Sequence, residues 1–214
     1  MAALGLVAAY GFEEANGNQV VDSSGSGNVG TVNGATRTPS GRIGGALAFD
    51  GVNDWVTVND ANSLDLTTTM TLEAWVFPTV TPSGWRTIIG KEASGRLCWY
   101  LHAGTDNANR PAAGVYVGAD RVLYGTATPA TNTWTHLAAT YDGQQQRLYV
   151  NGVQVANRAQ TGASLTSTSA LRIGGNGVFG EYFAGRIDEV RIYNRALTAG
   201  EIVTDMNRAV APGG

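Results

Sequence analysis

Short runs in which hydrophobic and polar residues alternate recur along this chain from end to end. Alternation with a period of two is typical of a half-buried β-strand, because successive side chains point to opposite faces. Residues that favour turns, mainly Gly, Asn and Asp, separate the runs. Strands are expected at 5–12, 44–51, 54–60, 70–77, 86–92, 96–103, 113–119, 121–127, 133–142, 146–152, 153–158, 171–175 and 186–194. This spacing predicts an all-β, two-sheet antiparallel sandwich.

The segment RLYVNGVQVA contains the clearest turn in the sequence. Asn151-Gly152 lies between two alternating segments, and this dipeptide is the strongest short-range signal for a β-hairpin. The segment therefore predicts two paired strands joined by a two-residue turn.

One helix is expected, close to the C-terminus. Thr198 and Glu201 have the spacing of a capping box, in which each side chain bonds to the backbone amide of the other residue. Ile202, Val203 and Met206 follow as one apolar face. The sequence therefore predicts a short C-terminal helix.

The composition agrees with a β-rich domain. The chain has 214 residues, of which 43% are hydrophobic and 14% charged, and it contains 29 glycines and five tryptophans. All-β domains of this length are common. Because no repeat or linker-like tract divides the sequence, residues 1–214 are expected to form a single domain.

The charges and the cysteine count exclude several classes of function. The net charge is −3 and the basic residues are scattered, so no basic patch is expected for nucleic acid or for an anionic membrane surface. Cys98 has no partner for an internal disulfide, and two distant histidines do not form a zinc cluster with it. The apolar run ALGLVAAYGF is too short to span a bilayer and is expected to be the first strand. The opening Met-Ala and the closing APGG favour a module taken from a longer, secreted chain.

Several segments in this order resemble the laminin G-like, concanavalin A-like jelly-roll domains of bacterial secreted proteins. They are GLVAAYGFEEANG, DSSGSGNVGTVNGA, GGALAFDGVNDWVTV, SLDLTTTMTLEAWVFP, WTHLAATYDGQQQRLYVNGVQV, LRIGG and FAGRIDEVRIYNRALTAGEI. The resemblance implies two curved antiparallel sheets, often a structural calcium, and often carbohydrate binding beside an enzyme in the same parent chain. Fold alone does not decide function.

Calcium ligands are expected in the loop DSSGSGN and in the strand GRIDEVRIYN. Calcium binds six to eight oxygen atoms, and the loop places oxygen-bearing side chains at every second position from Asp22 to Asn28. The alternation slips by one residue across Asp188 and Glu189, which predicts a β-bulge there. The resemblance also pairs such a loop with the Asp of the last strand. The expected ligands are Asp22, Asn28, Gly30 and Asp188; in the alternative, Asp22 only organises a turn.

A sugar-binding face is expected on the strand RLCWYLHA and its neighbours. Alternation predicts a core face and an opposite face, with Leu97, Trp99 and Leu101 on the first and Arg96, Cys98, Tyr100 and His102 on the second. Trp75 and Trp134 are expected in the core, since a Trp within an apolar strand is usually buried. The residues expected to contact sugar are Trp85, Arg86, Tyr100, His102, Tyr116, Glu181 and Tyr182. In the alternative, these are ordinary surface residues.

Catalysis is the less favoured expectation. The adjacent Asp188 and Glu189 point to opposite faces of a regular strand, whereas a retaining glycosidase needs two carboxyl groups about 5 Å apart. His102, Tyr100 and Tyr116 are residue types that a polysaccharide lyase uses, and His136 is expected to be a hydrogen-bonded structural residue. The sequence therefore predicts a non-catalytic, secreted carbohydrate-binding module with a structural calcium. The alternatives are a protein-binding adhesion module and a polysaccharide lyase or glycoside hydrolase.

Overall fold

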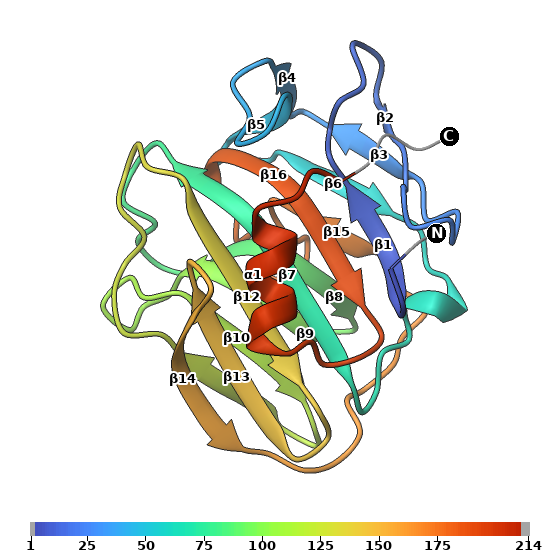
Figure 1. Cartoon of the computed structure of the whole chain (residues 1–214), viewed down its shortest axis with the longest axis vertical. Coiled ribbons are helices and arrows are strands. Elements are labelled where there is room, and N and C mark those ends of the chain that lie inside the picture. Colours follow the sequence, from blue (N-terminus) through green and yellow to red (C-terminus); the bar gives the residue numbers. More distant parts are fainter. Residues whose placement is uncertain (1–2, 211–214) are drawn as a thin grey trace.

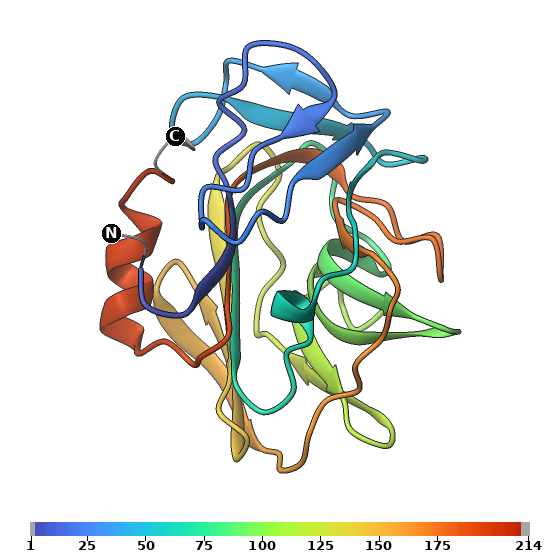
Figure 2. The same ribbon diagram turned by 90° about the vertical axis from the view of Figure 1, so that its right-hand side faces the viewer.

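Two eight-stranded antiparallel sheets pack face to face in the computed structural model, which describes residues 3–210 (Figures 1 and 2). This arrangement confirms the predicted jelly-roll sandwich. The opening Met-Ala and the closing APGG, from which a longer parent chain is expected, lie outside the described residues.

Sheet A runs in the order β14-β13-β12-β7-β16-β5-β4, and β1 also pairs with β16. Its strands are β1 (Leu6–Tyr10), β4 (Thr36–Thr38), β5 (Ala46–Asp50), β7 (Met70–Pro78), β12 (Thr135–Tyr141), β13 (Gln145–Val150), β14 (Val153–Ala159) and β16 (Ala184–Tyr193). Sheet B runs in the order β11-β10-β9-β8-β15-β6-β3-β2. Its strands are β2 (Gln19–Val20), β3 (Gly30–Asn33), β6 (Trp55–Val58), β8 (Arg86–Ala93), β9 (Arg96–Gly104), β10 (Ala112–Tyr116), β11 (Asp120–Tyr124) and β15 (Leu171–Ile173). A short 3₁₀ helix, η1 (Asn62–Leu64), precedes β7.

The hydrophobic core lies between the two sheets. Leu72 and Val76 of β7 enter it from sheet A, and Trp99 and Leu101 of β9 enter it from sheet B. Each of these side chains is at most 2% exposed. The residues that alternate with them therefore face outward on each sheet, and these outer faces are available for helices, loops or ligands.

The predicted hairpin and the predicted bulge are both present. Asn151 and Gly152 have φ angles of 50° and 77°, as the two-residue turn between β13 and β14 requires. In β16 the pairing with β7 shifts between Asp188 and Arg191, and Glu189 adopts a φ of 53°. The slipped alternation in the sequence is therefore a β-bulge.

Helix α1 (Ala199–Met206) begins with the predicted capping box, since both Thr198 and Glu201 bond to the other's backbone amide. It covers part of the outer face of sheet A (Figure 1), where the indole Nε1 of Trp75 donates to the Met206 carbonyl at 3.0 Å. Trp75 is thus buried under the helix rather than between the sheets. In the described part of the chain, no helix has the length and apolar character needed to cross a membrane.

Two further expectations about buried residues are wrong. Trp134 is only half-buried and packs beside Phe77 on the outer face of sheet A, with ring centroids 5.4 Å apart. In β9 the pairing with β8 skips Cys98, which makes this residue a bulge. Cys98 therefore turns into the core, although alternation placed it on the opposite face, and Leu97 faces outward instead.

Candidate binding site

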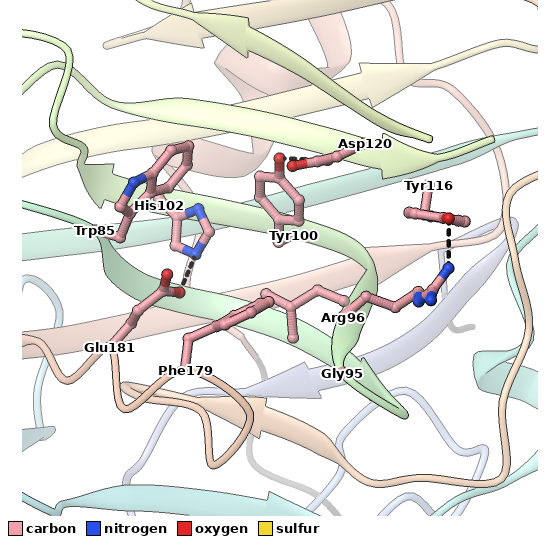
Figure 3. A pocket seen from close by; sticks show the side chains of 10 residues that line it. Trp85, Gly95, Arg96, Tyr100, His102, Tyr116, Asp120, Phe179 and Glu181 are labelled. Carbon is pink, nitrogen blue, oxygen red and sulfur yellow. Dashed lines mark hydrogen bonds and ion pairs between the residues drawn. The ribbon is translucent and has the colours of Figure 1, made fainter. Parts of the chain in front are cut away.

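A pocket of about 570 Å³ opens on the outer face of sheet B (Figure 3). Its volume is within the range of small-ligand sites. Its lining comprises Trp85, Gly95, Arg96, Leu97, Tyr100, His102, Tyr116, Asp120, Phe179 and Glu181. Five of the residues expected to contact sugar meet here: Trp85, Tyr100, His102, Tyr116 and Glu181.

Tyr100 and His102 of β9 form the floor of the pocket, with their ring centroids 4.5 Å apart. The Tyr100 hydroxyl donates to Oδ1 of Asp120 at 2.8 Å. Burial raises the pKa of this phenol, and the Asp120 carboxylate raises it further, so Tyr100 stays protonated. Gly114 lies opposite Tyr100 on β10, where a methyl group would come within 2.3 Å of the Tyr100 Cζ atom. A glycine at this position therefore lets the tyrosine ring lie across the neighbouring strand.

Glu181 reaches the pocket from the loop between β15 and β16, where three polar side chains hold it. Its Oε2 atom accepts a hydrogen bond from Asn176 at 2.7 Å and one from Thr87 at 3.2 Å, and it lies 3.2 Å from Nε2 of His102. Burial alone would raise the pKa of Glu181, but these hydrogen bonds and the His102 ring lower it overall. Glu181 is therefore an ionised acceptor on the pocket wall.

Aromatic rings form the remaining walls. Trp85, from the loop before β8, stands edge-on to His102 with centroids 5.3 Å apart. Tyr116, at the end of β10, lies beneath the guanidinium of Arg96, which is 4.5 Å from the ring centroid and also donates to the Tyr116 hydroxyl. The pocket therefore combines flat apolar surfaces with fixed hydrogen-bonding groups.

Five of the lining residues are not among the sugar contacts expected from the sequence: Gly95, Arg96, Leu97, Asp120 and Phe179. Alternation places Arg96 on the correct face, beside Tyr100 and His102. Asp120 pairs with Tyr116 across the hairpin of β10 and β11, so the alternation in AGVYVGADRVLY carried a signal for it. Phe179 is 56% exposed, and the signal for it was a phenylalanine in a glycine-rich loop.

Arg86 and Tyr182 do not line this pocket. Arg86 begins β8 opposite Gly104. Tyr182 follows Glu181 directly, yet its ring stacks on Trp55, with centroids 5.7 Å apart. The two consecutive side chains thus serve different parts of the sheet B surface.

The loop expected to bind calcium is organised around the Asp22 carboxylate, which is 8% exposed. Oδ1 accepts hydrogen bonds from the amides of Ala9 and Ser24, each at 2.9 Å. Oδ2 accepts them from the Ser24 hydroxyl at 2.8 Å and the Asn28 amide at 2.9 Å. The carbonyl of Asn28 accepts one from the Tyr10 hydroxyl at 2.5 Å. The oxygen atoms expected to bind a cation therefore face hydrogen-bond donors.

The other two expected ligands occupy separate surroundings. Asp188 accepts hydrogen bonds from the amides of Arg42 and Ile43 at 2.8 and 3.0 Å, which tie the bulge of β16 to the loop before β5. Burial raises the pKa of Asp188 to about 7, although these amides act in the opposite direction. Gly30 is explained by packing, because a methyl group there would lie 2.6 Å from a Val20 methyl.

These residues do not fit a shared calcium site in this arrangement. Asp22 and Asp188 share no hydrogen-bonding partner and each accepts from its own set of donors. Within residues 3–210, no three His, Cys, Asp or Glu side chains form a group that could hold a metal ion. Calcium binding stays a prediction, which a comparison of stability in calcium and in chelator tests.

His136 is buried as expected but is not hydrogen-bonded through its ring. Both of its ring nitrogens, and both carboxyl oxygens of Glu73, lack a hydrogen-bond partner among the described residues. Nε2 of His136 lies 3.9 Å from Oε2 of Glu73, and each side chain is fully buried. His136 is therefore a desolvated side chain beneath helix α1, and it does not line the pocket.

Residues 50–203 match the family model described as the concanavalin A-like lectin/glucanases superfamily. The match covers well over half of the 214 residues. The chain therefore belongs to this superfamily.

Two curated relatives match shorter parts of the chain. Pappalysin-1 from Mus musculus is 35% identical over 116 residues, which is 50% of this chain and 7% of that protein. Pappalysin-1 from Homo sapiens is 38% identical over 78 residues, which is 34% of this chain and 5% of that protein. The chain thus corresponds to a small part of the relatives that it matches.

Solved structures share the fold. Domain 4 of AbnA, an extracellular arabinanase from Geobacillus stearothermophilus solved in complex with arabinotriose, has a TM-score of 0.74 and 23% identity, covering 94% of this chain and 97% of that one. The binding domain of Paraclostridial Mosquitocidal Protein 1 also has a TM-score of 0.74, at 17% identity, covering 94% and 51%. Trypanosoma rangeli sialidase has a TM-score of 0.70 at 22% identity, covering 94% and 32%. At these identities, the likeness concerns the fold alone.

Proposed function

We propose that this chain is a carbohydrate-binding module that holds a neutral sugar in the pocket on the outer face of sheet B. The observation that carries the proposal is the pocket itself, where Trp85, Tyr116 and Tyr100 surround fixed acceptors and donors. A sugar presents C–H patches to aromatic faces and hydroxyl groups to Asp120, Glu181 and other polar side chains. The complex of an arabinanase domain of the same fold with arabinotriose adds support.

The charges in the pocket favour a neutral ligand. Asp120 and Glu181 contribute two carboxylates, whereas Arg96 contributes one guanidinium. The carboxylates repel an acidic sugar, and the guanidinium already lies over Tyr116. Neutral hydroxyl groups suit such acceptors, and each hydrogen bond to a charged group contributes about 1.5–3 kcal/mol net. Dissociation constants are therefore expected between micromolar and millimolar.

The pocket supports binding better than glycoside hydrolysis. A glycosidase needs one carboxylic acid with a raised pKa to protonate the leaving group. The pKa of Glu181 is lowered instead, because hydrogen bonds from His102, Asn176 and Thr87 outweigh burial. Glu181 is thus suited to accept hydrogen bonds from hydroxyl groups rather than to donate a proton.

Affinity electrophoresis against a panel of polysaccharides tests the proposal. Neutral arabinan, xylan, β-glucan and galactomannan are compared with acidic polygalacturonate and hyaluronan. We expect retention of the protein by at least one neutral polymer and by neither acidic one. Retention only by acidic polymers, retention by none, or the release of product would overturn the proposal.

Two alanine variants locate the site. Tyr116→Ala removes a pocket wall and should weaken binding by about fivefold, since an aromatic contact contributes about 1 kcal/mol. Trp134→Ala is the matched control, because Trp134 is also half-buried but lies beside Phe77 on the outer face of sheet A. Equal effects of the two substitutions would place the site elsewhere.

We also propose that the module acts outside the cell as part of a longer protein. The chain matches only 7% of mouse pappalysin-1 and 32% of the sialidase, so domains of this fold occur within larger chains. The arabinanase whose domain 4 shares the fold is extracellular. Immunoblotting of the source culture tests this: the antigen should be found in the medium on a band larger than 22.3 kDa.

A further inference from the structure

A second aromatic cluster lies on sheet B, beyond the loop that carries Glu181. Trp55 of β6 and Tyr182 stack with an angle of 21° between their rings. The guanidinium of Arg172, from β15, lies 4.7 Å from the centre of the Trp55 ring. Both rings are half-buried, so part of each remains open to solvent.

This cluster lies on the same face of sheet B as the pocket. Tyr100 on the pocket floor pairs with Gly90 of β8, Gly90 pairs with Arg172, and Arg172 pairs with Thr57 of β6. Paired residues of neighbouring strands point to the same side of a sheet. Trp55 is two residues from Thr57 and therefore shares that side.

The loop between the two sites is fixed to the sheet. The Gly177 amide donates to Oε1 of Glu92 at 2.6 Å, and Asn176 donates to Thr87 of β8 at 2.7 Å. Glu181 then points into the pocket while Tyr182, the next residue, packs on Trp55. Only the width of one chain segment therefore separates the pocket from the second cluster, and both are held in place before any ligand binds.

The chemistry of the second cluster matches that of the pocket. The charge of Arg172 is balanced by Glu92, whose Oε2 atom is 3.0 Å from the guanidinium Nε. Asn33 of β3 pairs with Trp55 of β6 across the sheet. The exposed side chain of Asn33 accepts a hydrogen bond from the Thr57 hydroxyl at 2.9 Å. Aromatic surface next to neutral polar groups suits a sugar ring rather than an ion.

We propose that Trp55 and Tyr182 form a second sugar subsite, so that one neutral polysaccharide chain contacts both the pocket and this cluster across the intervening loop. The proposal rests on the proposed function, because the pocket supplies the first contact. Joining two subsites on one ligand raises the affinity for a long chain without strengthening either contact. A polymer should therefore bind more tightly than its own trisaccharide.

The test compares chain lengths. Wild type, Trp55→Ala, Tyr182→Ala and Tyr116→Ala are titrated calorimetrically with the neutral polysaccharide of the panel that retains the wild type best, and with its trisaccharide. We expect Trp55→Ala and Tyr182→Ala to weaken polymer binding by about twofold to tenfold and to leave trisaccharide binding unchanged. Tyr116→Ala should weaken binding of both ligands.

Trp134→Ala serves again as the matched control, and the melting temperature of each variant shows that it is folded. Unchanged polymer binding in both Trp55→Ala and Tyr182→Ala would reject the second subsite while the pocket stands. Equal losses for polymer and trisaccharide would also reject it, since the effect would then come through the pocket. If no polymer retains the wild type, the proposed function fails and the second subsite fails with it.

Discussion

Among single residues, several buried polar side chains of this fold hold the backbone in place through hydrogen bonds. The Asp22 carboxylate accepts four hydrogen bonds and holds a glycine-rich loop against Ala9 of β1. In the pocket, three side chains hold Glu181 through its Oε2 atom. Among the described residues, no side chain holds its Oε1 atom in this way, so this oxygen can accept a hydrogen bond from a ligand. The same residue type therefore serves the fold in one place and recognition in the other.

Asp22→Ala should lower the free energy of unfolding by about 3 kcal/mol, because it leaves several buried amides without an acceptor. If the hydrogen bonds are the whole cause, the loss is the same in calcium and in chelator, measured by urea denaturation. Ser26→Ala is the control at an exposed position of the same loop. A wild-type stability that rises with calcium, and a variant that no longer responds, would restore the calcium site expected from the sequence.

Gly114→Ala should weaken sugar binding, because the new methyl group would come within 2.3 Å of the Tyr100 ring and displace it from the pocket floor. The expected loss is about tenfold in affinity for the polysaccharide that the wild type binds. Gly200→Ala is a matched control, since nothing lies within 4 Å of that site and alanine favours its helix. Wild-type affinity in Gly114→Ala would show that Tyr100 has no part in binding.

At the scale of elements, the strands of sheet A carry an unusual buried cluster beneath helix α1. His136 of β12 faces Glu73 of β7, and Arg191 of β16 pairs with Glu73 along the sheet. Burial, together with the nearby charge of Arg191, lowers the pKa of His136 to about 3. Burial raises the pKa of Glu73, so both groups favour their neutral forms.

The lowered pKa of His136 should make the fold sensitive to acid. Below about pH 6.5 the unfolded chain binds a proton at this residue that the folded chain does not, so stability falls as the pH falls. The difference in unfolding free energy between wild type and His136→Gln should decrease by about 2 kcal/mol from pH 7 to pH 5. The raised pKa of Glu73 changes stability with pH in the opposite direction, but Glu73 is present in both proteins, so its contribution cancels in this difference. A difference independent of pH would show that His136 titrates normally in the folded state.

Much of the element structure was predictable because alternation and turn residues are local signals. Alternation placed Tyr100, His102 and Tyr116 on one face, and the capping box located helix α1. It failed where a bulge reversed the facing of Cys98 and Leu97, because a bulge in β9 depends on its pairing with β8. The separation of Glu181 from Tyr182 was not predictable, since it depends on how a loop crosses the sheet.

At the scale of the whole molecule, the two outer faces of the sandwich carry different features. Helix α1 covers part of sheet A, with Trp75 beneath it, whereas the pocket opens on sheet B (Figures 1 and 3). The core between the sheets contains Trp99, which is fully buried. The five tryptophans therefore report on separate regions, with Trp85 in the pocket, Trp55 in the second cluster and Trp134 on the far side of the sandwich.

The most direct test of sugar binding on sheet B is an NMR titration that follows the five indole N–H signals of ¹⁵N-labelled protein. The ligand is the trisaccharide of the neutral polysaccharide that retains the protein best. The Trp85 signal should shift progressively to saturation, while the signals of Trp75, Trp99 and Trp134 stay in place. Shifts at Trp75 or Trp134 without a shift at Trp85 would contradict sugar binding in the sheet B pocket and move the binding site to sheet A.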